Sequence, residues 1–251
     1  PRVRRLAARA PQTGYNDILC SGGDGTVSLV AQALSDRSVA IGIIPRGTGN
    51  ILAKYLGIPL NVRAAIRHFV LSERTVALDA LVRPDGLSVL NLSVGVSSLT
   101  IADGDTRTKK VFGTAAYVAG VLAYLLWRNP ASFTIVADGR EVRVRAREVL
   151  VSNAGFRRTA IERIFARSVP DDGVVECSIF VAAGIAGALA LIADVIQGTT
   201  RRSDRYLRRL PVRDTITIDS DTPLPVQADG DPIGVGTVTA RVEPHVVQIR
   251  V

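Results

Sequence analysis

The hydrophobic pattern of this chain changes character near residue 74. Before that point, short and almost continuous apolar runs alternate with segments whose apolar residues recur at helical spacing, such as Val27, Val30 and Leu34. Continuous apolar runs separated by helices are typical of parallel strands that are buried on both faces. The pattern predicts strands at residues 18–20 and 39–44, and helices at residues 2–10, 26–34, 51–56 and 61–71.

After residue 74 most segments alternate or run apolar in the manner of strands. Helices are predicted at residues 112–127 and 185–196, and strands at residues 75–81, 87–96, 133–136, 141–147, 149–153, 174–181, 215–218, 225–228, 236–241 and 246–251. We therefore expect an α/β domain with a parallel sheet in residues 1–74. A mainly antiparallel β domain of the sandwich type should follow in residues 75–251, and its last strand could return to the first domain.

The composition agrees with a globular protein and narrows the chemistry. Apolar residues make up 47% of the chain and charged residues 22%, which excludes a disordered chain. Cys20 and Cys177 have no CxxC spacing and no nearby pair of histidines, so we expect two buried free thiols and no zinc site. The apolar stretches at residues 115–127 and 181–196 are too short, or interrupted by Asp194, to span a bilayer.

The net charge of +8 would suit nucleic acid, anionic lipid or a polyphosphate ligand. Aromatic residues are only 5% of the chain and do not alternate with the arginines, which argues against a platform for nucleic acid. Five arginines crowd one short segment and could seat on an anionic membrane at roughly 1 kcal/mol each: Arg201, Arg202, Arg205, Arg208 and Arg209. A solvated loop is an equally good interpretation of this segment.

Each of the first two predicted strands runs into a glycine-rich turn that leads into a helix. Residues 21–26 read SGGDGT, and residues 45–50 read PRGTGN. Glycine lets the backbone approach a ligand closely, and the following helix offers unpaired N–H groups and the positive end of its dipole. Both turns should lie at the carboxyl ends of neighbouring strands, so they are expected to form one phosphate-binding edge. Neither turn is a GxxxxGK[ST] or a GxGxxG sequence, which disfavours a Walker loop and a dinucleotide dehydrogenase.

Asp24 changes the chemistry expected at this edge. A carboxylate repels a bare phosphate, but it becomes favourable when Mg²⁺ lies between the two, directly or through water. Thr26 could either cap the following helix or donate its hydroxyl to a phosphate. Taken alone, Asp229-Gly230 and Asp172-Gly173 indicate turns, and Asp79 indicates the edge of a strand.

Taken in order, these motifs resemble the catalytic domain shared by diacylglycerol kinases, sphingosine and ceramide kinases, and soluble bacterial lipid kinases. ATP–NAD kinases and phosphofructokinases share a related GGDG element, but PRGTGN points to the lipid kinases. The resemblance covers nearly the whole chain, because four later segments agree with it: residues 109–127 (KKVFGTAAYVAGVLAYLLW), 149–155 (VLVSNAG), 168–175 (SVPDDGVV) and 227–231 (QADGD).

The resemblance implies a two-domain lipid kinase fold, with an α/β nucleotide-binding domain and a β-sandwich lipid-binding domain, and with ATP and Mg²⁺ as cofactors. It implies that ATP is contacted by Gly22, Gly23, Asp24, Gly25, Thr26, Val27, Ser28, Leu29, Gly47, Thr48 and Asn50. It implies that a Mg²⁺–water network includes Asp24 and Asp79, and that a structural metal is held by Asp172 and the main-chain carbonyls of Val169 and Val174. The general base for the lipid hydroxyl would be Asp229 or Asp231.

This sequence departs from the family pattern at several points. It begins after the strand and the N-P-x-x-G turn that normally contribute to the ATP site. Ser28 and Leu29 replace an Asn-Glu pair, and Ile51 stands where bacterial diacylglycerol kinases often have aspartate. Asp231 is one methylene shorter than the usual glutamate. A carboxylate displaced by about an ångström would cost on the order of 10²-fold in rate.

The expected function is that of an ATP- and Mg²⁺-dependent lipid kinase, similar to diacylglycerol or sphingosine kinases. It would be cytoplasmic, would associate peripherally with a membrane, and would take a lipid substrate presented at that surface. The helices at residues 112–127 and 185–196 would line an acyl groove or simply form core. No nucleic-acid partner is expected, and a homodimer is one option for the oligomeric state. The alternatives are an NAD kinase-like phosphotransferase, a catalytically degenerate module that binds nucleotide or lipid, and, more distantly, a basic RNA-binding module.

Overall fold

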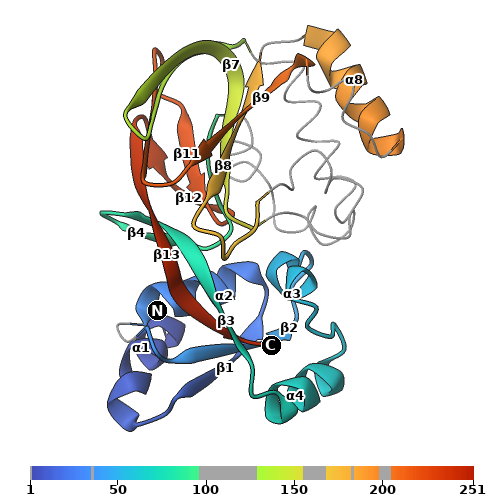
Figure 1. Ribbon diagram of the computed structural model, residues 1–251, viewed down its shortest axis with the longest axis vertical. Helices are drawn as coiled ribbons and strands as arrows, with labels where there is room; N and C mark the ends of the chain where they lie inside the picture. Colours follow the sequence, from blue (N-terminus) through green and yellow to red (C-terminus); the bar gives the residue numbers. More distant parts are fainter. Residues whose placement is uncertain (1, 35–36, 96–128, 155–167, 182–183, 198–204) are drawn as a thin grey trace.

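The computed structural model describes residues 2–34, 37–95, 129–154, 168–181, 184–197 and 205–251. The helix predicted at residues 112–127 and the arginines at positions 201 and 202 lie outside these residues. Figure 1 shows an α/β half below and a β half above, joined by two long strands that run through both. In the described part of the chain, no helix is long and apolar enough to cross a membrane.

The α/β half is built on a short parallel sheet. β1 (Asp17–Gly22) pairs with β2 (Ala40–Pro45) in parallel, in a register that runs from Asp17↔Ala40 to Gly22↔Pro45. β13 (Val238–Arg250) lies parallel to β2 at Ile249↔Ile41 and antiparallel to β3 (Thr75–Arg83). The helices of this half are α1 (Arg2–Arg9), the 3₁₀ helix η1 (Ala10–Thr13), α2 (Asp24–Ala33), α3 (Ile51–Tyr55) and α4 (Val62–Leu71).

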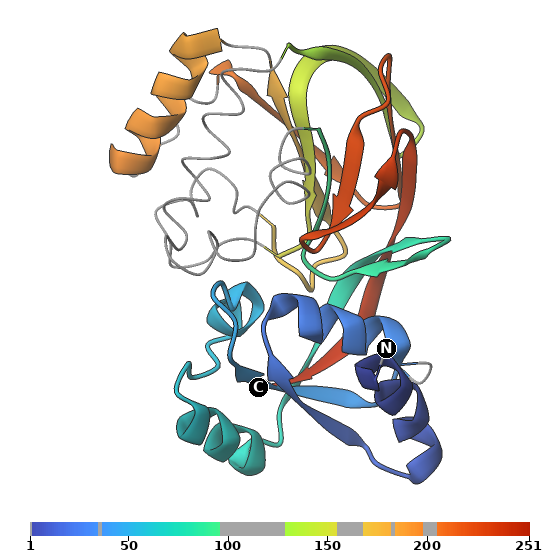
Figure 2. The same ribbon diagram turned by 180° about the vertical axis from the view of Figure 1, so that it is seen from behind.

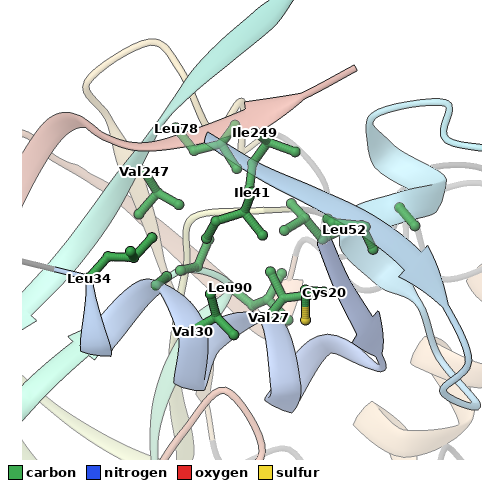
Figure 3. Close-up of a cluster of buried hydrophobic side chains, with 14 of the residues drawn as sticks. Cys20, Val27, Val30, Leu34, Ile41, Leu52, Leu78, Leu90, Val247 and Ile249 are labelled. Atoms are coloured by element: carbon green, nitrogen blue, oxygen red, sulfur yellow. The ribbon is translucent and has the colours of Figure 1, made fainter. Parts of the chain in front are cut away.

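One apolar core joins α2 to the sheet of this half. Val27 and Val30 of α2 pack toward Ile41, and Ile249 of β13 belongs to the same cluster (Figure 3). Leu90, which follows β4 (Gly86–Ser88), is buried in the same core. The segment that leads into the second half is therefore anchored on the helix that follows the first glycine loop.

The β half is mainly antiparallel and has its own core. In the combined sheet the strand order is β1-β2-β13-β10-β6-β7-β5-β11-β12, with β8 paired to β7 and β9 paired to β8. Phe133, Ile135, Ile179 and Ile216 are among its fully buried side chains. Its elements are β5 (Asn91–Gly95), β6 (Ala131–Ala137), β7 (Arg140–Ser152), β8 (Val175–Val181), α8 (Gly184–Gln197), β9 (Leu207–Val212), β10 (Thr215–Ser220), β11 (Pro225–Ala228) and β12 (Asp231–Val235).

The predicted fold class is confirmed: an α/β region with parallel strands precedes a mainly antiparallel β domain. The boundary near residue 74 stays a prediction, because β3 starts at Thr75 and still pairs with the part of β13 that lies beside β2. The two buried thiols are also as expected, since Cys20 and Cys177 are free and buried. Burial raises the thiol pKa to about 11 for Cys20 and to about 12 for Cys177, so neither is a reactive thiolate at neutral pH.

Several predicted strands have the wrong extent. The single strand predicted at residues 87–96 is instead β4 and β5, because the N–H groups of residues 89–91 donate to the carboxylate of Asp229. Conversely, the strands predicted at residues 141–147 and 149–153 are one strand, β7, with a bulge at residues 146–148. β13 likewise joins two predicted strands through an irregularity between Glu243 and Val247.

A hairpin turn in the β half predicts a pH-dependent contribution to stability. The exposed carboxylate of Asp138 accepts hydrogen bonds from the backbone N–H groups of Arg213, Asp214 and Thr215 at 2.9, 2.9 and 3.1 Å. Burial acts to raise the pKa of Asp138, but the three donors and the charge of Arg213 outweigh it and lower the pKa below its usual range. The ionised form therefore ties the β6–β7 turn to the turn before β10.

We expect Asp138→Asn to destabilise the protein at neutral pH, with a difference from wild type that shrinks as pH falls below about 4. The pKa of Asp138 is lower in the folded protein than in the unfolded chain. The stabilisation that its carboxylate gives is therefore present above the unfolded pKa and is lost on acidification. Asparagine tolerates the left-handed φ of 49° at this position, so the backbone should be unchanged. Urea midpoints of both proteins from neutral to acidic pH measure the effect, and a difference independent of pH would contradict it.

Candidate active site

The two glycine loops lie directly against each other at the carboxyl ends of β1 and β2. A Cβ added to Gly47 would stand 2.6 Å from the Cα of Gly23, and one added to Gly23 would stand 2.9 Å from the Cα of Gly47. The N–H of Arg46 also donates to the carbonyl of Gly22 at 2.9 Å. Only glycine permits backbones to meet at this distance, so the two loops form a single surface.

The first turn of α2 opens onto free space. Gly23 is the N-cap residue, and its carbonyl accepts from the N–H groups of Thr26 and Val27 at 3.0 and 3.2 Å. A Cβ added to Gly25 would meet no described atom within 4 Å. This end of α2 therefore combines a helix N-terminus with room for a ligand, which is the arrangement that suits an anion such as a phosphate.

Asn50 holds the second loop in shape. Its Oδ1 accepts from the N–H of Gly47 at 2.8 Å, and its Nδ2 donates to the carbonyl of Gly47 at 2.7 Å. Asn50 itself has a left-handed φ of 47°, which asparagine tolerates better than most residues. Thr48 between these contacts is exposed, so its hydroxyl is accessible to a ligand.

Asp24 links the first loop to the helix after the second. Its Oδ2 accepts from the N–H of Ile51 and its Oδ1 from the N–H of Leu52, both at 3.0 Å. The carboxylate thus caps the N-terminus of α3, a role that sequence reasoning did not find because the partners lie far along the chain. Each oxygen still has a second lone pair, so this geometry does not remove Asp24 from the predicted Mg²⁺ network.

Asp229 is the most heavily bonded carboxylate in the described part of the site. Its Oδ1 accepts from the N–H groups of Leu90 and Asn91 at 2.8 and 2.9 Å. Its Oδ2 accepts from the N–H of Val89 at 2.8 Å and from the hydroxyl of Ser28 at 2.6 Å. An ionised carboxylate offers about four acceptor positions, and all four are filled.

These bonds give Asp229 a structural effect that spans both halves. Burial raises the pKa of its carboxyl, while the four donors act against that rise because they favour the ionised form. Through Ser28 it connects α2, which follows the first glycine loop, to the β11–β12 turn, where Asp229 and Gly230 both have positive φ. Asp231 lies two residues further on, at the exposed start of β12.

Asp79 and the DDG segment meet at a different place. The buried carboxylate of Asp79 accepts from the N–H groups of Gly173 and His245 at 2.7 and 2.9 Å, and so fixes the loop that carries Asp172. Asp172 accepts from the N–H of Val174 at 3.0 Å. Asp172 and Val174 line a cavity of about 320 Å³, and its other lining residues are Ser168, Val175, Glu176, Arg209 and Pro211.

Some of the predicted site residues contact each other in the structure, and others do not. Gly23 meets Gly47, and Ser28 meets Asp229, whereas Val27 is core and Val169 is exposed. Asn153 is a residue whose role sequence reasoning missed. Its Nδ2 donates to the carbonyls of Asp79 and Val89 at 2.6 and 2.8 Å. The sequence signal for this role was the asparagine at the end of the predicted strand at residues 149–153.

Comparison with known protein families identifies the family of this chain. The profile of the "Diacylglycerol kinase catalytic domain" matches residues 2–81, and that of the "YegS C-terminal NAD kinase beta sandwich-like domain" matches residues 91–251. The chain belongs to the YegS-like lipid kinase family. The second profile alone spans more than half of the chain, and the two follow each other in the order that the fold shows.

Individual relatives of this YegS-like chain carry consistent names. A protein of Pseudomonas savastanoi pv. phaseolicola called "Probable lipid kinase YegS-like" is 26% identical over 98% of this chain and 79% of its own length. A "Diacylglycerol kinase" of Mycobacterium tuberculosis is 32% identical, over 55% of this chain and 46% of its own length. Both similarities are to proteins longer than the part that aligns.

Solved structures agree with the family at the level of the fold. A diacylglycerol kinase from Bacillus anthracis superposes with a TM-score of 0.78 at 18% identity, covering 99% of this chain and 81% of that one. An NAD kinase from Archaeoglobus fulgidus in complex with ATP superposes with a TM-score of 0.55 at 14% identity, covering 99% and 89%. The YegS-like fold is therefore related to that of NAD kinases.

The YegS-like site can be tested for its fit to ATP and Mg²⁺. The open space beside Gly25 and the paired glycine loops fit phosphate groups. The described residues contain no cluster of three His, Cys, Asp or Glu side chains that could hold a metal alone. A Mg²⁺ ion here would need phosphate oxygens and water for most of its ligands, which is how Mg²⁺ is commonly bound in kinases.

Proposed function

We propose that this chain forms the core of an ATP- and Mg²⁺-dependent kinase that phosphorylates a lipid hydroxyl. Kinases of the diacylglycerol kinase family use ATP, and this chain belongs to the YegS-like branch of lipid kinases. The observation that carries the proposal is the hydrogen bond between Ser28 and Asp229. It joins the loop suited to phosphate to the turn that leads to Asp231, so that donor and acceptor sites would share one cleft.

On this proposal each part of the site has a distinct role. The N–H groups at the start of α2 and the loop held by Asn50 would bind the phosphates of ATP. Thr48 would donate its hydroxyl, and Asp24 would orient water around the metal. Bound Mg²⁺ neutralises charge on the transferred phosphoryl group. The residues of this chain supply positioning, which is most of what phosphoryl transfer requires.

Of the two aspartates considered for the general base, Asp231 has the more suitable surroundings. The carboxylate of Asp229 already accepts four hydrogen bonds, so taking a proton would break at least one of them. Asp231 is exposed at the start of the next strand, where a lipid hydroxyl could reach it. We propose that Asp229 positions the turn and that Asp231 accepts the proton.

Two other functions are favoured by particular observations. The fold shared with NAD kinases favours a soluble dinucleotide as acceptor. Leu29 and Asp231, which replace glutamates of the family pattern, favour a domain that binds nucleotide without transferring phosphate. The proposed lipid kinase differs from both in its product, so a single assay separates the three.

The assay uses radiolabelled ATP, Mg²⁺ and a panel of vesicles that contain diacylglycerol, sphingosine or ceramide, with NAD as the soluble acceptor. We expect label in the lipid phase, and a loss on the order of 10²- to 10⁴-fold in Asp231→Asn, which keeps the size of the side chain but cannot accept the proton. Asp219→Asn, an exposed aspartate on β10, serves as the matched control. Label only in NAD, or ATP binding without any product, would overturn the proposal.

A further inference from the structure

Helix α4 carries an unusual outer face. Five of the twelve exposed large apolar side chains in the described residues fall within residues 60–71. Val62, Ile66 and Val70 are spaced by four residues, so they form one stripe along the helix. Val70 and Leu71 are 70% and 68% exposed. Val62, Ile66 and Val70 therefore form a strip along one element and not a scatter of single residues, and Leu71 lies about 100° further around the helix.

The face of α4 that packs on the protein adjoins this stripe. Ala65 is buried, and the ring of Phe69 occupies the space that a Cβ on Gly42 of β2 would need. Asn61 caps the helix by accepting from the N–H of Ala64 at 3.2 Å. α4 is thus fixed in orientation by Ala65 and Phe69. The stripe beside them is partly packed at Val62 and Ile66, which are 37% and 39% exposed, and open at Val70.

The two charged side chains of α4 itself are both positive, and the exposed pair Glu73 and Arg74 follows the helix. Arg63 and Arg67, also spaced by four residues, form an exposed row next to the stripe. Residues 60–72 contain no aspartate or glutamate. A second copy of the chain docked through the same face would bring these arginines against each other without an acidic partner on the helix itself. The partner that complements this face is apolar and anionic together, which is the chemistry of an anionic bilayer surface.

The position of α4 in the fold suits the same partner. α4 and α8 lie on one side of the molecule, to the right in Figure 1 and to the left in Figure 2. α8 is mostly apolar in sequence, and its Leu189 is exposed. α3, which Asp24 ties to the first glycine loop, lies on that side as well.

We propose that the outer face of α4 is a membrane-docking surface that inserts Val62, Ile66, Val70 and Leu71 at an anionic lipid interface, with Arg63 and Arg67 against the head groups. The purpose of this docking rests on the proposed lipid kinase function. The docking itself does not, since it needs no ATP and no reaction.

The test is co-sedimentation of the chain with vesicles of phosphatidylglycerol or of phosphatidylcholine, without nucleotide. We expect binding to phosphatidylglycerol vesicles only. Two variants probe the two parts of the surface, Val70→Gln with Leu71→Gln and Arg63→Gln with Arg67→Gln, and each pair should weaken binding roughly 10-fold or more. Both sets of side chains are exposed, so the fold should be retained, which circular dichroism checks.

Matched controls come from the β half. Val235→Gln removes a side chain that is 67% exposed, close to the exposure of Val70, and Arg140→Gln with Arg145→Gln removes two exposed arginines. These controls should bind as wild type does. Equal binding by all variants, or no binding to either vesicle, would overturn the proposal. Binding lost only in the arginine pair would also overturn it, because simple attraction to polyanions, such as an acidic protein, would then suffice. Vesicle binding without lipid phosphorylation would count against the proposed function alone.

Discussion

Replacement of Asp229 by alanine is expected to lower the free energy of unfolding by about 3–5 kcal/mol, because four donors lose their acceptor at once. Three of them are the consecutive backbone N–H groups of residues 89–91, where β4 has ended and β5 begins. The fourth is the hydroxyl of Ser28, which is buried on α2. Urea denaturation followed by circular dichroism measures the loss. Kinase activity should disappear as well, since the turn that carries Asp231 loses its anchor.

Two variants separate the contributions within this cluster. Ser28→Ala removes one donor and leaves three bonds to Asp229, so a loss of about 1 kcal/mol is expected. Asp229→Asn keeps the size but presents an NH₂ group to N–H donors, so its effect should lie between those of Ser28→Ala and Asp229→Ala. A stability of Asp229→Ala within about 1 kcal/mol of wild type would show that water replaces these bonds, and that Asp229 is not the anchor of the turn.

The second large effect is expected from Gly47→Ala. The new methyl group would lie 2.6 Å from the Cα of Gly23, a contact between backbone segments that neither loop can relieve by changing a rotamer. Overpacking of this kind costs about 1–3 kcal/mol. A displacement by about an ångström of the glycine loop that we propose binds phosphate should reduce the rate of phosphoryl transfer on the order of 10²-fold. Thermal unfolding and the vesicle kinase assay report the two consequences.

Gly25→Ala is the matched control for that substitution. Its methyl group would enter open space at the first turn of α2, where no described atom lies within 4 Å. Stability should be unchanged or slightly higher, because alanine is the better helix former. ATP affinity should nevertheless fall, since the methyl group would occupy the space assigned to phosphate. Unchanged ATP affinity in Gly25→Ala, measured by calorimetry, would exclude this position as the phosphate site.

The sequence predicted the loops well because their signals are local. The strand, glycine turn and helix order around residues 21–26 and 45–50 follows from adjacent residues, and the structure has β1, β2, α2 and α3 there. The partners of individual side chains were beyond local reasoning. Asp24 caps a helix that begins 27 residues later, and Asp229 binds N–H groups about 140 residues earlier. The first contact depends on how the two glycine loops meet, and the second on how the two halves pack.

The strands that sequence reasoning missed have similar physical causes. β9 reads LRRLPV, and its arginines suggested a solvated or membrane-binding loop, yet it pairs with β8 and buries Leu207 and Val212. β12 contains Pro232 and Gly234, which lower strand propensity, and it is tolerated because it ends the strand order of the described sheet. In both cases tertiary pairing outweighs local preference.

β13 has a consequence for how the protein is made. It lies beside β2, and its pairing with β3 runs from residue 241 to residue 250. During synthesis, β1, β2 and β3 leave the ribosome long before this strand exists. The folding of the α/β half must therefore wait until nearly all of the β half has been translated, because Ile41 and Leu78 lack their neighbour Ile249 until then. Such a long-range closure is intrinsically slow and leaves apolar surface exposed. A ribosome that stalls before β13 would release a chain whose earliest segment cannot finish folding.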